Sequence, residues 1–493
     1  MIYVYITEPS YRTDTILVSW LDILQERLQE FFGPSRDQST FSDDAFLYPS
    51  WSLALSEPHP DPELSQPTNT ASHVPGRLGR ASLNGAKDIT VQVAENHRLT
   101  PPSHFQEVRS VRLVGRELSN CRPGDAVGMF PRNAELDVHA LLVLLKAEAV
   151  ADCPLKIVSL TSRAEDIPKS LIQHAGLLTL RSIAANQLDL NSVPRRSFIR
   201  RISYFASEPA ERERLRELSS SEFIEEYYDY VTRPRRTTLE LLQDFSSVTI
   251  PWSYAASIIP LMHVRWFSIS RSMALDAPNQ RGSVQQSAVV PAVELLIATV
   301  DYQTVIRKRR KGVCTNYIAT VKPGTSLRVL YQQGSIITSL SDHTRSAIMI
   351  GTGTGIAPLR SLLWERRTFG TDSEARVLLF FGGRNIRADY FFCDEWDDLA
   401  KDLHLQVFPT FSRDQRQKHY VQDKLHEESA LLWEIINEEQ GIVYVCGSSG
   451  KMPAAVRQTL VDVFQKEGKM SSEKANAYIL AMIQANRYKQ ETW

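Results

Sequence analysis

The chain has 493 residues, of which 43% are hydrophobic and 23% are charged, a composition that supports packed cores and excludes a fibrous or mostly disordered protein. Its 56 basic and 57 acidic residues nearly cancel, so no overall positive field favours nucleic acid or an anionic membrane. The 5 scattered cysteines include no Cys-x-x-Cys pair, which excludes a disulfide framework or cysteine-rich zinc site and favours a reducing compartment.

Two segments of different composition begin the chain. Residues 1–33 predict one amphipathic helix, because apolar side chains from Val18 to Leu28 recur at helical spacing before Gly33 ends the pattern. Residues 34–86 are rich in Pro, Ser, Asp and Gly and are predicted to form a disordered linker. No apolar run approaches the roughly 20 residues of a membrane-spanning helix, so we expect no membrane anchor.

Residues 87–345 predict an antiparallel β-barrel domain with an α-helical insert. Short alternating segments begin near Ile89 and strand signals resume at Trp266, which is typical of an antiparallel sheet or barrel. Between them, at about 140–250, long stretches rich in Leu, Arg, Glu and Ser favour helices.

Residues 346–493 predict an α/β domain with a parallel sheet. Three apolar strands, ending at Ile350, Phe381 and Cys446, each run into a turn containing glycine. Repeated units of this kind form parallel sheets that bind ligands at the carboxyl ends of the strands. The fold class expected for the chain is therefore multidomain, with a barrel followed by this α/β domain.

The first strand of this domain leads into Gly351-Thr-Gly353-Thr354-Gly355 and then a helix. Glycines let the backbone approach a pyrophosphate closely, and the helix amino terminus offers unpaired N–H groups. A glycine-rich turn without any ligand is the alternative interpretation.

A second polar segment follows a later strand. Ser412 and Arg413, with Lys418 and Tyr420 a few positions on, supply two cations and two hydroxyls. Such a set can hold a 2′-phosphate through charge-assisted hydrogen bonds and would select NADP(H). A solvated charged loop is the alternative.

Two segments of the barrel domain also carry relevant chemistry. Arg265-Trp266-Phe267-Ser268 places a cation, an aromatic ring and a hydroxyl on one strand, with Arg265 and Phe267 on the same side. An aromatic ring there can stack on a flavin while Arg265 neutralises a pyrophosphate. Gly312-Val313-Cys314-Thr315 could open a short helix on phosphate.

In this order and spacing, the motifs resemble the FAD- and NADP-binding reductases of the ferredoxin–NADP reductase type, in their diflavin version. The likeness covers about residues 96–493 and is greatest to the NADPH-dependent diflavin reductases of cytosolic iron–sulfur cluster assembly. Further segments that support this branch are Pro102–Glu107, Ser192–Phe198, Arg233–Thr237 and Arg487–Trp493.

The resemblance implies a role for each matching residue. The expected FAD contacts are Arg236, Arg265, Trp266, Phe267, Ser268, Gly312, Val313, Cys314 and Thr315, with Trp493 covering the flavin. The expected NADP(H) contacts are Gly353, Thr354, Gly355, Ser412, Arg413, Lys418, His419, Tyr420, Val421 and Gln422. Ser268, Cys446, Glu491 and Trp493 would act at the hydride-transfer step. A core plug is the alternative role for a terminal tryptophan.

Two positions depart from the family pattern. Phe267 stands where many relatives have tyrosine, which removes only a hydroxyl. Ala455 replaces an aspartate, so one nucleotide contact is absent. No histidine shows ligand spacing, and we expect no metal.

The resemblance also implies the wider electron path. In the full family, electrons pass from NADPH through FAD and FMN to an anamorsin-like iron–sulfur protein, and we expect a cytoplasmic enzyme with mitochondria as a second compartment. We recognise no flavodoxin-like FMN domain ahead of the linker, so residues 1–33 are interpreted as its last helix. Two interpretations stay open: a truncated or mispredicted product whose activity is impaired by the loss, or a working single-flavin reductase. A cytochrome P450 reductase, a sulfite reductase flavoprotein and a catalytically silent binding protein are the alternatives.

Overall fold

The computed structural model describes residues 46, 48–56, 86–161, 167–168, 171, 178–273, 290–334, 336, 342–369 and 374–493. The FMN-domain remnant expected at residues 1–33 lies outside them. Pro49–Thr492 form one compact unit.

A closed barrel of six strands carries the first half of the site, as the sequence predicted. Its neighbouring strands are all antiparallel, in the order β10-β2-β3-β7-β6-β4. Alternate side chains such as Val91, Leu113 and Leu295 fill the interior, and the helix α10 adds Cys314 and Ile318 to the same core. The bounds are β2 (Lys87–Arg98), β3 (Val108–Val114), β4 (Ala126–Met129), β6 (Arg265–Ser272), β7 (Ala292–Ala298), α10 (Val313–Thr320) and β10 (Ser326–Gln332).

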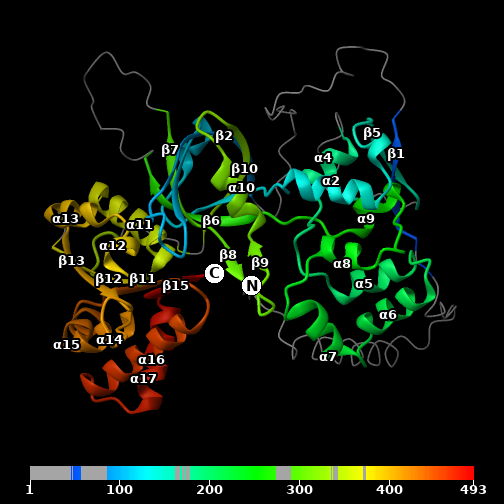
Figure 1. Cartoon of the computed structure of the whole chain (residues 1–493). Helices are drawn as coiled ribbons and strands as arrows, with labels where there is room; N and C mark the ends of the chain where they lie inside the picture. Colours follow the sequence, from blue (N-terminus) through cyan, green and yellow to red (C-terminus); the bar gives the residue numbers. More distant parts are fainter. Residues whose placement is uncertain are drawn as a thin grey trace, which may run out of the picture. The chain divides into compact units, whose positions relative to one another are not determined.

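The chain leaves the barrel after β4 and returns at β6, and the segment between them is mostly helical (Figure 1). The helices share one apolar core, to which Leu141, Ile183 and Ile199 belong. They are α2 (Glu135–Leu144), α4 (Leu180–Asn186), α5 (Arg196–Ser203), α6 (Pro209–Ser219), α7 (Ile224–Tyr227), α8 (Thr238–Asp244) and α9 (Ala255–Ile258), with the short helices η2 (Glu148–Val150), η4 (Tyr228–Thr232) and η5 (Trp252–Tyr254).

The prediction of a disordered linker at residues 34–86 is wrong for Trp51–Leu55. Trp51–Leu55 form strand β1, which pairs antiparallel with β5 (Leu155–Ser159) beside the helical insert. Trp51 and Leu53 are buried in the core of the insert. The alternation of Trp51, Leu53 and Leu55 with small residues is a strand signal that the surrounding prolines and serines obscured.

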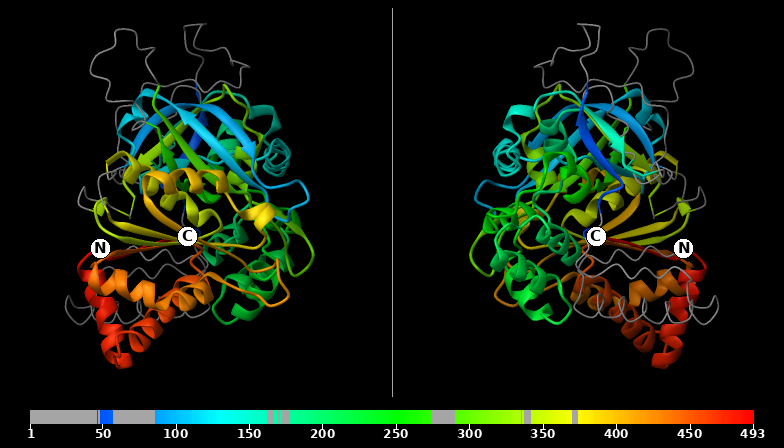
Figure 2. Two further views of the ribbon diagram at one scale, coloured as in Figure 1. Left: turned by 90° about the vertical axis from the view of Figure 1, so that its left-hand side faces the viewer. Right: turned by 90° about the vertical axis from the view of Figure 1, so that its right-hand side faces the viewer.

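The carboxy-terminal domain contains a five-stranded parallel sheet in the order β13-β12-β11-β14-β15, as predicted. Figures 1 and 2 show α11 and α13 on one face and α14, α16 and α17 on the other. The strands are β11 (Ala347–Thr352), β12 (Arg376–Gly383), β13 (His404–Phe411), β14 (Ile442–Gly447) and β15 (Tyr488–Thr492). The helices are η7 (Gly353–Gly355), α11 (Ile356–Phe369), α12 (Ile386–Asp389), α13 (Cys393–Asp402), α14 (Val421–Glu427), α15 (Ser429–Trp433), η8 (Glu434–Glu438), α16 (Lys451–Lys466) and α17 (Ser472–Gln484).

The strand order places the ligand-binding position of this sheet. The chain runs from the central strand β11 outward to β12 and β13, and then returns to the other side of β11 as β14 and β15. The carboxyl ends of β11 and β14 therefore flank the point where the order reverses, which is where ligands bind in open parallel sheets.

Candidate functional site

Strand β6 presents the predicted flavin-binding residues at the edge of the barrel. Phe267 is half-buried and packs against the barrel core, whereas Trp266 lies over Gly128 of β4, so the two rings occupy opposite faces. The Arg265 side chain is 46% exposed, and its closest carboxylate is Asp189 at 3.9 Å. Because that ion pair is long, the guanidinium remains available to an anion.

The amino terminus of α10 provides unpaired N–H groups in the same domain. No acceptor among the described residues bonds the backbone N–H groups of Val313, Cys314 or Thr315. Gly312 is required ahead of them, since a Cβ at this position would lie 2.7 Å from Val300 Cβ. The positive charge of Arg265 acts on the Cys314 thiol. Free N–H groups and a nearby cation fit the pyrophosphate of FAD.

Arg236, also predicted to contact FAD, has other partners. Its guanidinium forms an ion pair with Asp244 and donates to the carbonyl of Tyr230 at 3.0 Å. It also lies over the ring of Tyr230, 4.0 Å from the centroid. Its charge is therefore already compensated inside the helical insert, and its role at FAD stays a prediction.

Three residues expected at the hydride-transfer step meet, although they are distant in the sequence. The Ser268 hydroxyl on β6 donates a hydrogen bond to Glu491 Oε1 on β15. Glu491 is in turn the register partner of Cys446 in the parallel pairing of β14 with β15. The barrel and the sheet thus bring a hydroxyl, a carboxylate and a thiol together at the carboxyl end of β14.

The electrostatics of this group keep the thiol neutral. Cys446 has no exposed surface, and burial raises its pKa well above the usual value, with the charge of Glu491 adding to the effect. A thiolate beside a carboxylate would be repelled, so Cys446 remains protonated at neutral pH. Trp493 is 45% exposed, and its role over the flavin stays a prediction.

The glycine-rich turn after β11 lies directly against Cys446. A Cβ on Gly355 would be 2.3 Å from the Cys446 carbonyl oxygen, so only glycine permits this approach. Gly353 has a φ of +55°, which favours glycine, and the short helix η7 leads into α11. The turn that contains Thr354 thus connects the nucleotide-binding position with the Ser268–Glu491 pair.

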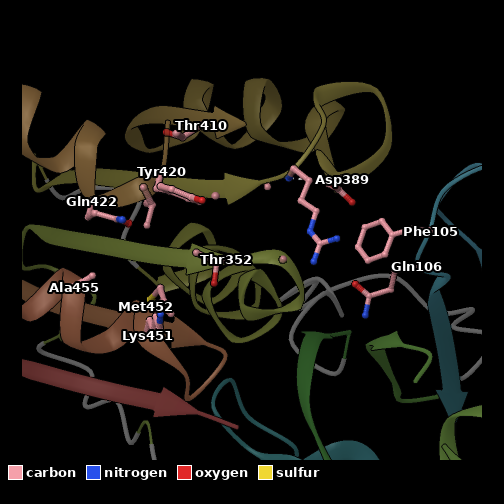
Figure 3. A pocket seen from close by; sticks show the side chains of 15 residues that line it. Phe105, Gln106, Thr352, Asp389, Thr410, Tyr420, Gln422, Lys451, Met452 and Ala455 are labelled. Atoms are coloured by element: carbon pink, nitrogen blue, oxygen red, sulfur yellow. Dashed lines mark hydrogen bonds between the residues drawn. The ribbon is translucent and has the colours of Figure 1, made fainter. Parts of the chain in front are cut away.

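A pocket of about 550 Å³ opens at the carboxyl ends of the central strands (Figure 3). Its walls come from both domains. They include Phe105, Gln106, Thr352, Gly353, Gly382, Gly383, Arg384, Asp389, Thr410, Tyr420, Val421, Gln422, Lys451, Met452 and Ala455. Ala455, the position that departs from the family pattern, therefore lies in the wall of this pocket.

The residues predicted to select a 2′-phosphate divide between this pocket and its surroundings. Tyr420, Val421 and Gln422 line it, whereas Lys418 and His419 line a second pocket of about 850 Å³ that shares Thr410 with the first. Ser412 is buried, and its hydroxyl donates to the Gly383 carbonyl at 3.3 Å. Neither Arg413 nor Lys418 forms an ion pair with a residue that the structure describes.

Arg384 is a site residue that sequence reasoning missed. It lines the first pocket, and the backbone N–H of Arg413 donates to its carbonyl at 2.8 Å. Burial lowers the pKa of Arg384, and the like charge of Arg413 lowers it further. The signal available in the sequence was an arginine directly after the Gly382-Gly383 strand end.

The described residues offer neither a metal site nor a membrane-spanning helix. No three His, Cys, Asp or Glu side chains among them are grouped to hold a metal ion. No helix in the same part of the chain combines the length and apolar character needed to cross a bilayer.

Comparison with known families assigns both domains. Residues 82–317 match the FAD binding domain family, and residues 349–458 match the oxidoreductase NAD-binding domain family. These matches confirm the prediction of an FAD-binding and a nicotinamide-nucleotide-binding domain.

Similar proteins extend over nearly the whole chain. A protein from Emericella nidulans and one from Aspergillus fumigatus are each 36% identical over 97% of this chain and 76% of their own length. A protein from Xenopus laevis is 33% identical over 97% of this chain and 77% of its length. All three are named NADPH-dependent diflavin oxidoreductase 1.

Proposed function

The chain belongs to the NADPH-dependent diflavin oxidoreductase family, and we propose that it passes electrons from NADPH through a bound FAD to a protein acceptor. The observation that carries this proposal is the meeting of Ser268, Glu491 and Cys446 beside the glycine-rich turn. In this contact β6, which carries the residues proposed to bind flavin, meets the carboxyl end of the sheet, where we propose that the nucleotide binds.

The residues of the barrel would hold FAD. The free N–H groups of α10 and the guanidinium of Arg265 fit its pyrophosphate, and the half-buried ring of Phe267 supplies a flat apolar surface for the flavin. When bound, FAD supplies the chemistry that converts a two-electron donor into single-electron steps. The protein positions it and excludes competing reactions.

Ser268, Glu491 and Cys446, which meet where the two domains contact, would control the proton and the charge at the transfer step. The Ser268 hydroxyl is oriented by its hydrogen bond to Glu491, whose carboxylate can hold or release a proton. Cys446 remains a neutral thiol, so it adds no second negative charge where a hydride would pass. This arrangement supports roles for all three residues at the transfer step.

The protein that accepts the electrons can be proposed more specifically. We propose an iron–sulfur protein of the anamorsin type, reduced in the cytoplasm during iron–sulfur cluster assembly. The support is the resemblance of the four branch-specific segments named above and the diflavin name of the similar proteins.

Flavin analysis with anaerobic NADPH titration tests the proposal. The purified protein should release one FAD per chain on denaturation, and NADPH should bleach its visible absorbance. Protein without flavin, or FAD that NADPH cannot reduce, would contradict it. Ser268→Ala should retain FAD but slow the reduction by about tenfold, because a hydrogen bond to a charged group contributes about 1.5–3 kcal/mol.

A further inference from the structure

The loop between β2 and β3, residues 99–107, reaches from the barrel into the nucleotide pocket. Phe105 and Gln106 of this loop line the pocket, although every other lining residue comes from the carboxy-terminal domain. Figure 3 shows both side chains at one end of the cavity, opposite Tyr420. A residue of the flavin-binding domain thus forms part of the wall that would hold the nucleotide.

Phe105 makes a specific contact there. Its ring lies against the guanidinium of Arg384, 3.8 Å from the ring centroid to the Arg384 Cζ atom. The ring remains 57% exposed, so packing in a core does not explain its position. A cation held over an aromatic face is attracted to it, and the face also restricts the rotamers of the long arginine side chain.

His104 of the loop lies beside α12, the short helix that follows Arg384. Its Nε2 atom lies 2.8 Å from Asp389 Oδ1, and both side chains are nearly buried. The other oxygen of Asp389 accepts hydrogen bonds from the backbone N–H groups of Arg384 and Asn385, at 3.0 and 2.9 Å. The loop thus contacts the side chain of Arg384 through Phe105, and through His104 it lies beside the carboxylate that holds the Arg384 backbone.

The loop is itself rigidly built. Arg98 donates to the carbonyls of Thr100 and Pro101, each at 2.8 Å, and the Thr100 hydroxyl accepts from the N–H of Val108 at 3.0 Å. A preformed loop can position a partner without an added cost in conformational entropy.

We propose that Phe105 is a positioning residue for nucleotide binding, which holds the guanidinium of Arg384 in the pocket from the barrel side. The ligand is the phosphorylated adenosine portion of NADP(H), so the inference rests on the proposed function. Arg384 and Arg413 are close together and carry like charges, and an anion between or beside them relieves that repulsion. Nucleotide affinity then depends on a side chain of the flavin-binding domain.

Substitutions at Phe105 in the full-length, FAD-loaded protein test this inference. Phe105→Ala and the apolar but ring-free Phe105→Leu should each raise the KM for NADPH and the Kd for 2′,5′-ADP by about three- to tenfold. Phe105→Tyr should retain normal values, because it keeps the aromatic face. The rate at saturating NADPH should fall less than KM rises, since Phe105 acts on binding.

A double variant separates positioning from a general structural role. Phe105→Ala should have no further effect on the Kd for 2′,5′-ADP in an Arg384→Ala background, because its action passes through Arg384. Phe369→Ala is the matched control. Phe369 is 49% exposed and its ring stacks on His343, but it is the last residue of α11 and does not line the pocket. It should leave nucleotide binding unchanged.

The outcomes distinguish this inference from the proposed function. Normal binding by Phe105→Leu, or equal losses from Phe105→Ala with and without Arg384, would overturn the positioning role while NADPH reduction of the wild type stands. If the wild-type protein binds no 2′,5′-ADP and is not reduced by NADPH, the proposed function fails and the inference fails with it.

Discussion

Arg413 and Lys418 show how single charged residues would determine nucleotide choice. Both lack ion-pair partners among the described residues, and Lys418 lines the second pocket beside His419. His419, by contrast, contacts Glu427 at 2.9 Å, which already satisfies one of its ring nitrogens. The two unpaired cations are therefore the better candidates for a dianionic 2′-phosphate.

Replacing both cations should change selectivity rather than chemistry. Arg413→Ala with Lys418→Ala should raise the KM for NADPH by about tenfold or more, whereas the KM for NADH, which has no 2′-phosphate, should change little. Steady-state kinetics with a small one-electron acceptor measures both constants. Equal effects on the two nucleotides would show that these residues do not read the 2′-phosphate.

At the scale of elements, Glu240 joins the helical insert to a hairpin of the barrel domain. It lies on α8 and accepts hydrogen bonds at 2.7 and 2.6 Å from Arg310 on β9 (Arg309–Lys311), which pairs with β8 (Asp301–Gln303). Lys308 forms a further ion pair with it. Within the basic run 307–311, residues 309–311 thus form a strand, and Lys308, Arg309 and Arg310 each form an ion pair.

This junction predicts a pH-dependent stability. Burial alone would raise the pKa of Glu240, but the bonds from Arg310 and Lys308 outweigh it and lower the pKa to about 2. A carboxylate with a depressed pKa stabilises the fold above its unfolded pKa of 4.5, and the contribution is lost as the pH falls through 2. Glu240→Gln should therefore reduce the free energy of unfolding at pH 7 by up to about 3 kcal/mol.

Urea unfolding at several pH values measures this effect. The difference between wild type and Glu240→Gln should be full above about pH 5 and should shrink steadily below it. Glu213→Gln, at an exposed position on α6, is the control and should change stability by less than about 0.5 kcal/mol. A difference that does not vary with pH would refute the linkage.

At the scale of the whole compact unit, Arg360 connects the barrel to the carboxy-terminal domain. Its side chain on α11 is 2% exposed, and it donates to Ser270 of β6 at 3.1 Å and to Glu294 of β7 at 3.0 Å. It also pairs with Glu395 of α13 at 2.7 Å. Ser270 lies two residues from Ser268 on the same face of β6, so this cluster also supports the Ser268–Glu491 contact.

Removal of this buried cation should be costly. Arg360→Met should lower the free energy of unfolding by about 3 kcal/mol, because it removes the buried cation that two partly buried carboxylates share. Changing Glu294 and Glu395 to Gln in the same chain should recover part of the loss. Arg367→Ala, which removes exposed ion pairs from the same helix, should cost about 1 kcal/mol or less.

Chemical denaturation followed by circular dichroism compares these three variants. A loss from Arg360→Met no larger than that from Arg367→Ala would show that the cluster does not stabilise the domain contact. Rapid-mixing measurement of flavin reduction in the same variants reports whether a looser contact also slows the transfer step.

The sequence by itself determined the features that depend on local chemistry. Alternating apolar residues predict the barrel, strand ends rich in glycine predict the parallel sheet, and Arg265, Gly312 and Gly355 are predicted to approach phosphate groups. These signals lie within a few neighbouring residues, so they can be recognised without the fold.

The tertiary structure alone decided the contacts between distant segments. The pairing of β15 with β14 brings Glu491 beside Cys446, the meeting of β6 with β15 brings Ser268 to both, and the loop 99–107 brings Phe105 to Arg384. Arg236 was predicted to contact FAD and Arg384 was not predicted at all, yet Arg236 is compensated by Asp244 whereas Arg384 lines the pocket. The availability of a charge depends on its neighbours in space, and those neighbours come from packing rather than from local pattern.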